Sequence, residues 1–283
     1  MAIVEKKFSI INKFNDEIRG IIEFDDNGKN LPLIFVIHGF KGWKDWGFLP
    51  YLSKKLAEAN AISVRFDFSL NGMSENSDLV AYPDKFAANT VSREISDLID
   101  VYSFFKDGTF LDILPNEGFW DGRVYLIGHS LGGAISILSS EKINSDGMVL
   151  LASVSKLARY TERQKIQWRK DGFLSFVNNR TGQELTINLS YLEDIEKNNY
   201  NEKLLNLMRS YNNPILILHG KEDLTVPVAE AFELFEAGKN NKQINLQIIE
   251  KTGHTFGIEH PFVKASDALE QIITMIKQFI GLK

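Results

Sequence analysis

Residues 123–133 carry the stretch that decides the fold, RVYLIGHSLGG. The first half, Arg123–Ile127, is rich in β-branched and aromatic residues and predicts a strand. The second half has the pattern Gly-x-Ser-x-Gly centred on Ser130, and Leu131–Glu141 directly after it predicts a helix. A strand that turns sharply into a helix is the repeating unit of α/β folds.

Strand and helix patterns alternate on both sides of this turn. The chain opens with Val4–Ile11 and Glu17–Phe24, which predict an antiparallel hairpin. Leu31–Ile37 is almost wholly apolar, as expected of a strand that helices cover on both faces. We therefore predict an α/β fold with a mostly parallel central sheet flanked by helices. The later segments are strands at Ala61–Phe68, Gly147–Ala152, Pro214–His219 and Asn245–Glu250, and helices at Leu49–Asn60, Asn89–Phe105, Val226–Ala237 and Ser266–Ile280.

One connection, residues 153–213, is much longer than the others. It has about 60 residues, whereas connections in α/β units usually have about 2–6. We predict a core of residues 1–152 and 214–283 and an inserted cap of residues 153–213, which could act as a mobile lid. The insertion has patterns of its own: helices at Lys156–Arg169 and Tyr200–Arg209, and a hairpin of Phe173–Val177 with Glu184–Leu189 around residues 178–182.

Composition excludes several classes of protein. The chain of 283 residues has 37 acidic and 32 basic residues and no basic run, so no nucleic-acid partner is expected. It has no cysteine, which excludes disulfides, thiolate metal sites and a cysteine nucleophile. No apolar stretch approaches the ~18 residues of a membrane helix, and the charged amino terminus does not resemble a secretory signal. We expect a cytoplasmic protein without membrane association.

The Gly-x-Ser-x-Gly pattern predicts that Ser130 is a nucleophile. The pattern alone is weak, because a chain of this length has roughly a one-in-ten chance of containing it. The strand-turn-helix context is more specific, since it is the setting of a nucleophile elbow, whose tight turn requires small residues. The alternative is a phosphate-binding turn, but the chain has neither Gly-x-Gly-x-x-Gly nor a P-loop lysine here.

A serine nucleophile needs a base and an acid that orients the base. Their order in this architecture is serine, acid, histidine. His254 follows the last predicted strand, where active-site loops gather, and is favoured over His260, which precedes a proline. Asp223 lies in the loop after Pro214–His219; its alternative role is to cap the next helix. The other histidines are expected to be structural: His38, His129 and His219.

An acyl-transfer site also needs hydrogen-bond donors for the developing oxyanion. The backbone N–H groups of Leu131 and Phe40 are the candidates, since they follow the serine and the predicted strand Leu31–Ile37. Four aromatic residues are predicted to line an aromatic-tolerant cleft, although each ring could instead pack the cap onto the sheet: Trp43, Trp46, Trp168 and Phe173.

These pieces resemble the α/β-hydrolase superfamily over almost the whole chain. His38-Gly39-Phe40, Gly128–Gly132, Asp223 and His254 follow the order of that superfamily. The segment from Asp67 to Ser74 is similar to the loop after the next strand, but Phe68–Gly72 departs from its usual Arg-Gly-x-Gly form.

Within the superfamily, the chain is similar to the cinnamoyl and feruloyl esterases and related small carboxylesterases. The similarity lies in the His-Gly-Phe loop and in a cap that contains a hairpin. It implies an α/β-hydrolase fold and hydrolysis of a small-molecule ester through an acyl-enzyme on Ser130, with no metal and no organic cofactor. The residues leave open another serine hydrolase of this fold, such as a peptidase, an acylglycerol lipase or a thioesterase, and a non-catalytic ligand receptor.

Overall fold

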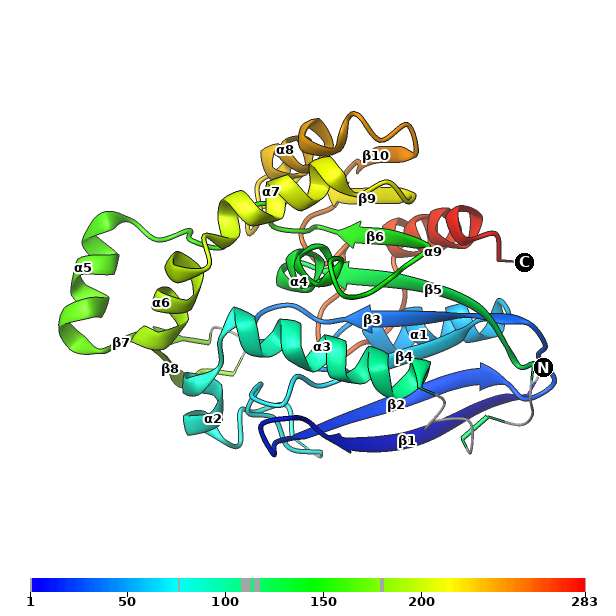
Figure 1. Ribbon diagram of the computed structural model, residues 1–283, viewed down its shortest axis with the longest axis horizontal. Helices are drawn as coiled ribbons and strands as arrows, with labels where there is room; N and C mark the ends of the chain where they lie inside the picture. The colour runs from blue at the N-terminus through cyan, green and yellow to red at the C-terminus, as the bar shows by residue number, and fades with distance from the viewer. Residues whose placement is uncertain (1, 76, 108–112, 115–117, 179–180, 283) are drawn as a thin grey trace.

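An eight-stranded sheet forms the centre of the molecule in the computed structural model (Figure 1). The first two strand pairs, β1/β2 and β2/β4, are antiparallel, and every later pair is parallel. The structure describes residues 2–75, 77–107, 113–114, 118–178 and 181–282. In spatial order the strands are β1 (Ile3–Ile11), β2 (Glu17–Asp25), β4 (Ile62–Phe66), β3 (Leu31–Ile37), β5 (Trp120–His129), β6 (Gly147–Leu151), β9 (Ile215–Gly220) and β10 (Ile244–Ile249).

Helices cover both faces of the sheet (Figure 1). Helices α1 (Leu49–Glu58) and α9 (Asp267–Ile280) contact each other on one face. On the other face α3, α4, α7 and α8 form a continuous row in which each helix contacts the next. The predicted α/β fold, with its mostly parallel sheet and flanking helices, is therefore confirmed. None of the described helices is long and apolar enough to cross a membrane. The four helices that form the row on the second face are α3 (Val91–Lys106), α4 (Leu131–Ser139), α7 (Tyr200–Ser210) and α8 (Val228–Gly238).

The parallel strands end at a common edge of the sheet. Ile37 at the end of β3 pairs with Gly128 of β5, and Gly220 at the end of β9 pairs with Ile249 of β10. Strands β3, β6 and β9 are buried along their whole length, as their continuous apolar runs predict. The loops after β3, β5, β9 and β10 consequently gather over one edge.

The first part of the long insertion lies outside the sheet. It contains α5 (Glu162–Asp171), the antiparallel pair β7 (Phe173–Val177) and β8 (Glu184–Asn188), and α6 (Leu189–Lys197). Figure 1 shows these elements projecting to one side of the sheet. The hairpin lies where it was predicted; residues 179–180 of its turn lie outside the described residues.

Two helices of the insertion differ from the predicted pattern. Helix α5 begins at Glu162 and not at Lys156, because Thr161 and Gln164 form a capping box that fixes its start. Helix α6 was not predicted, although it buries Tyr191 and Ile195 on one face, four residues apart.

Helix α7, the last part of the predicted cap, lies on the sheet between α4 and α8. The reason is topological. Strands β6 and β9 are parallel neighbours, so the chain must return to the opposite edge of the sheet before β9 begins, and α7 makes that crossing. We use the term cap lobe for residues 153–199, the part that precedes this helix.

Side-chain hydrogen bonds join the cap lobe to the core. Asp194 of α6 accepts hydrogen bonds from the backbone N–H of Ser92, at 2.8 Å, and from the Ser92 hydroxyl, at the start of α3. The side-chain amide of Gln183 accepts a hydrogen bond from the backbone N–H of Val80 at 2.9 Å and donates one to the Val80 carbonyl oxygen at 3.0 Å. These bonds anchor the lobe to the start of α3 and to Val80.

Candidate active site

Ser130 stands on a strained turn between β5 and α4. Its φ is 56° and its ψ is −118°, a backbone conformation that costs energy for a residue with a side chain. The turn also needs its neighbouring glycines. A Cβ on Gly128 would lie 2.3 Å from the Gly132 carbonyl oxygen, and one on Gly132 would lie 2.4 Å from the Ile37 carbonyl oxygen. This is the local geometry of a nucleophile elbow.

Asp223 and His254 are brought together from different loops. His254 Nδ1 lies 2.8 Å from Asp223 Oδ2, so the Nδ1–H can donate to the carboxylate and leave Nε2 free to accept a proton. His254 and Ser130 both line the same pocket. His260, the alternative base, is not among the lining residues; its Nδ1 accepts the backbone N–H of Gly47 at 3.0 Å.

The other oxygen of Asp223 organises its own loop. Oδ1 accepts the backbone N–H groups of Thr225 and Val226, both at 2.8 Å. The N-cap of α8 is Pro227, so Asp223 closes a turn ahead of that helix and does not cap it. One oxygen thus fixes the aspartate while the other faces the histidine.

The charge of Asp223 is stabilised despite its burial. Burial by itself would raise the pKa of this carboxyl, but hydrogen bonds from His219 and His254 outweigh burial and lower that pKa. His219 Nε2 lies 2.8 Å from the Val226 carbonyl oxygen and 3.3 Å from Asp223 Oδ2. Asp223 is therefore an anion that can orient His254 and stabilise its cationic form.

His129 supports the backbone of His254. Its Nε2–H donates to the His254 carbonyl oxygen at 3.0 Å, and the two rings lie 4.7 Å apart. Burial, with a contribution from His254, lowers the pKa of His129 to about 3. His129 consequently stays neutral and does not compete with its neighbour for protons.

The loop after β3 packs directly against the elbow. A Cβ on Gly39 would lie 2.9 Å from Ser130 Cβ and 3.4 Å from the backbone nitrogen of Leu131. Leu131 is the first residue of α4, so its N–H has no acceptor within the helix. Phe40 follows Gly39 and lines the same pocket. The two predicted oxyanion donors therefore belong to adjoining backbone segments beside Ser130.

The ring of Phe40 connects this loop to the cap lobe. It lies 5.7 Å from the ring of Phe86 in α2 (Pro83–Ala88) and 5.7 Å from the ring of Phe176 in β7. The ring of Tyr191 in α6 is 6.5 Å away. The position of the loop thus depends on aromatic contacts with both the core and the cap lobe.

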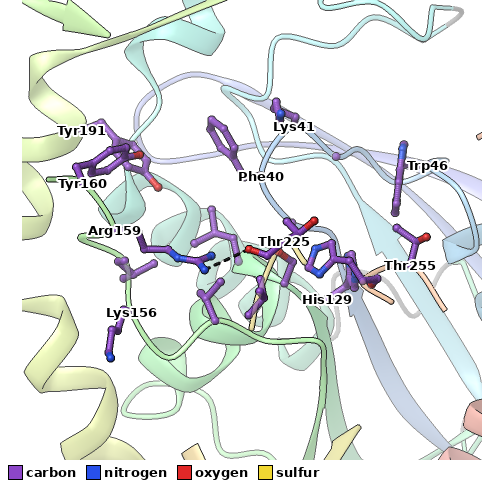
Figure 2. Close-up of a pocket in the computed structure, with 18 residues that line it drawn as sticks. Phe40, Lys41, Trp46, His129, Lys156, Arg159, Tyr160, Tyr191, Thr225 and Thr255 are labelled. Atoms are coloured by element: carbon purple, nitrogen blue, oxygen red, sulfur yellow. Dashed lines mark hydrogen bonds between the residues drawn. The ribbon is translucent and has the colours of Figure 1, made fainter. Parts of the chain in front are cut away.

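A pocket of about 510 Å³ opens beside Ser130 and is bounded by the loops of the sheet edge and by the cap lobe (Figure 2). In Figure 2 Tyr160 and Tyr191 lie at one end and Trp46 at the other, with Arg159 reaching toward Thr225. The described lining residues are Gly39, Phe40, Lys41, Gly42, Trp46, His129, Ser130, Leu131, Val154, Lys156, Leu157, Arg159, Tyr160, Tyr191, Thr225, Val226, His254 and Thr255.

Of the four aromatic residues predicted for the cleft, only Trp46 lines this pocket. The prediction is wrong for the other three. Trp43 packs edge-on against His260, and Trp168 is fully buried behind the pocket, where it contacts Tyr160 and Tyr191. Phe173 is 46% exposed because it lies on the outer face of the hairpin. Trp168 therefore shapes the pocket only through the two tyrosines.

The polar wall of the pocket was not predicted. Arg159 and Tyr160 lie in an irregular stretch ahead of α5, where no periodic pattern marks the buried side. The spacing of Tyr191, Leu192 and Ile195 was a usable signal for α6, but only the fold reveals which end of that helix faces the pocket. Within the described parts of the chain, no group of three or more His, Asp or Glu side chains could hold a metal ion.

Comparison with protein families gives one match over most of the chain. A family model described as the prolyl oligopeptidase family matches residues 80–282. The matched range contains Ser130, Asp223 and His254. No curated protein matches the sequence.

Solved structures with similar folds align over almost the full length. Est1E from Butyrivibrio proteoclasticus, solved with ferulic acid bound, has 19% identity and a TM-score of 0.71, covering 96% of this chain and 97% of its own. An esterase domain from a Rhodothermus marinus protein has 16% identity and a TM-score of 0.65, covering 98% and 97%. The esterase Pf2001 from Pyrococcus furiosus has 18% identity and a TM-score of 0.63, covering 98% and 92%. These similarities show a shared fold.

Proposed function

Because the chain belongs to the prolyl oligopeptidase family and is a serine hydrolase of the α/β-hydrolase fold, we propose that it is a carboxylesterase acting on small to medium esters. The observation that carries the proposal is the pairing of His254 with Asp223, 2.8 Å apart, in a pocket that also exposes Ser130 on its elbow. Ester hydrolysis needs these three groups and two oxyanion donors, and no cofactor.

In the first half-reaction Ser130 Oγ attacks the carbonyl carbon of the ester. His254 Nε2 takes the hydroxyl proton as the new C–O bond forms, and the N–H groups of Leu131 and Phe40 bind the oxyanion. The bond to the alcohol oxygen then breaks, and His254 returns the proton to that oxygen. The products are an acyl-enzyme on Ser130 and a free alcohol.

In the second half-reaction water takes the place of the alcohol. His254 removes a proton from the water, whose oxygen attacks the acyl carbon, and the carboxylic acid leaves as Ser130 regains its proton. Asp223 holds the imidazole in the tautomer that both steps require, and its charge stabilises the transient imidazolium.

Two features guide the choice of substrates. The pocket, at about 510 Å³ and lined by the rings of Phe40, Trp46, Tyr160 and Tyr191, suits a compact substrate with apolar or aromatic parts. The similar structures from Rhodothermus marinus and Pyrococcus furiosus are described as esterases, and Est1E holds ferulic acid, so an aromatic acyl group belongs among the first substrates tested.

The proposal is tested by hydrolysis of 4-nitrophenyl esters from acetate to octanoate and of methyl ferulate, by the wild type and Ser130→Ala. We expect turnover on at least one ester and a loss of about 10⁴-fold or more in the variant. Turnover that survives the substitution, or none on any ester, would overturn the assignment of Ser130 as an esterase nucleophile.

Peptide hydrolysis is the second candidate, because the matching family is described as prolyl oligopeptidases. The same triad can cleave an amide, with an amine leaving in place of the alcohol. Parallel assays with prolyl and other aminoacyl 4-nitroanilides decide between the two activities. A kcat/KM for any of these amides above that of every ester would favour the peptidase.

A further inference from the structure

The charged residues that line the pocket are all cationic. Lys41, Lys156 and Arg159 belong to the described lining, whereas no aspartate or glutamate does. The chain as a whole has a formal net charge of −5, so the lining has the opposite sign to the molecule. A pocket with this distribution favours a substrate that carries negative charge.

Arg159 is the cation with the most defined position. Its Nη2 donates to the Thr225 carbonyl oxygen at 3.3 Å (Figure 2). The same atom donates to Glu230 Oε1 at 2.7 Å. Among the described residues, Nε and Nη1 have no hydrogen-bond partner, and the side chain is 34% exposed. A guanidinium has five N–H groups, so donors on Nε and Nη1 remain for a ligand.

Glu230 holds this arginine in place from behind the pocket. Its Oε2 accepts the backbone N–H of Ser155 at 2.8 Å and the Ser155 hydroxyl at 3.3 Å, while Oε1 binds Arg159. Glu230 is buried and does not line the pocket. The guanidinium is thus oriented before a ligand arrives, which reduces the entropy lost on binding.

The other two cations differ from Arg159 in their surroundings. Lys156 Nζ forms an ion pair with Glu233 at 3.1 Å, and its side chain is half exposed. Lys41 Nζ lies over the rings of Phe40 and Phe176, at 5.9 and 5.5 Å from their centroids. Both add positive charge around the pocket, and Arg159 is the one whose described partner is the buried carboxylate of Glu230.

We propose that Arg159 binds a carboxylate on the substrate, so that the preferred substrates are esters bearing a second, free carboxyl group. This inference rests on the proposed esterase function and names its substrate class. The alternative is that Arg159 only ties the cap lobe to Thr225 in the loop that carries Asp223. If Arg159 were only a structural tie, replacing it would change kcat/KM for neutral and anionic esters by the same factor. If it binds the substrate carboxylate, replacing it lowers kcat/KM for the anionic ester more than for the neutral one.

Two pairs of esters test the inference on either side of the scissile bond. 4-Nitrophenyl hydrogen adipate is compared with its methyl-capped form, and 4-carboxyphenyl butanoate with its methyl-capped form. In at least one pair we expect Arg159→Gln to lower the ratio of kcat/KM, anionic over capped, by about tenfold or more, since hydrogen bonds to charged groups contribute that much. A ratio that Arg159→Gln leaves unchanged in both pairs overturns the inference.

Arg169→Gln is the matched control. Arg169 lies on α5, forms an ion pair with Glu196 and is not among the residues that line the pocket. Removing its charge should leave both ratios within about twofold, because an exposed charge outside the pocket is screened by solvent and salt. A change as large as that of Arg159→Gln would mean that only the overall charge matters, which overturns the assignment of Arg159.

A binding measurement separates this inference from the proposed function. If the wild type hydrolyses no ester, the esterase proposal fails, but calorimetry of hexanoate binding to Ser130→Ala still tests Arg159. We expect hexanoate to bind and a further Arg159→Gln substitution to weaken it about tenfold. No binding, or binding unaffected by that substitution, overturns the inference.

Discussion

The sheet edge and the cap lobe form opposite walls of one pocket, and they position side chains in different ways. At the sheet edge Ser130 is placed by a strained backbone turn and Asp223 by two backbone N–H groups. In the cap lobe Tyr191 lies against Trp168, and Arg159 is held mainly by Glu230. Backbone geometry thus fixes the groups that would do the chemistry, while contacts between side chains fix the groups that would select the substrate.

The difference predicts where substitutions act. A change at the sheet edge should abolish turnover and leave the fold intact, because backbone bonds maintain the geometry. A change in the cap lobe, or in helix α3 to which Asp194 anchors it, should alter stability or local opening first. The three predictions below compare the two regions, from the largest expected effect to the smallest.

Asp223→Asn should lower kcat by about 10⁴-fold if the proposed triad operates. Asparagine Oδ1 can still accept the N–H groups of Thr225 and Val226, so the loop should keep its shape. The amide NH₂ would face His254 Nδ1 and force the proton onto Nε2, which could then no longer accept one from Ser130. Steady-state kinetics with the best ester of the panel measures the loss.

Glu222→Gln is the control, since Glu222 is adjacent but exposed. It should retain kcat within about twofold, because its exposed side chain is not among the described residues that line the pocket. Asp223→Asn activity within about tenfold of the wild type would contradict the role given to the sheet edge.

Glu94, on α3, should make stability depend on pH. Burial, together with the charge of Asp97, raises the pKa of Glu94 to about 8 even though Asn89 donates to its Oε1 at 2.7 Å. The folded state then binds more protons than the unfolded state between about pH 4.3 and about pH 8, so the free energy of unfolding falls as pH rises through that window. Urea unfolding should show Glu94→Gln gaining about 1–3 kcal/mol over the wild type from pH 5 to pH 8.

The exposed Glu222→Gln serves again as the reference and should follow the wild type at every pH. A constant difference between Glu94→Gln and the wild type would show that Glu94 is already ionised in the folded protein at pH 5. Protonation of Glu94 on α3 would then not contribute to the pH dependence of stability.

Asp194→Ala should lower the free energy of local opening of the cap lobe by about 1 kcal/mol. That is the usual contribution of a hydrogen bond that completes the first turn of a helix. It removes the acceptor for Ser92 at the start of α3. Hydrogen exchange should quicken in α6 and leave the central strands unchanged. Glu193→Ala, an exposed neighbour on the same helix, should change nothing. Faster exchange throughout the sheet would mean that the lobe and the core open as one unit.

The sheet and the candidate triad could be predicted because short-range patterns specify them. Continuous apolar runs predict buried strands, and the turn around Ser130 depends on glycines two positions on either side of it. Asp223 and His254 follow predicted strands in an order that the architecture requires. The predicted roles of these residues await the kinetic tests above.

The pocket could not be predicted in the same way, because its lining depends on contacts between residues far apart in sequence. Trp168 was expected in the cleft, but it is fully buried behind Tyr160 and Tyr191, and nothing local distinguishes the two placements. Arg159 depends on Glu230, 71 residues later. The crossing helix α7 has a pattern that fits both a cap and a core helix; the parallel pairing of β6 and β9 decides between them.

The pairing of β6 with β9 also has an evolutionary consequence. No described residue of the cap lobe is a backbone hydrogen-bond partner of a strand in the eight-stranded sheet, so the lobe can lengthen, shorten or be replaced without changing the pairing of that sheet. A gene encoding this scaffold could therefore acquire a new substrate range by exchanging one contiguous stretch of coding sequence, while the sheet, the elbow and the loops around it are inherited unchanged.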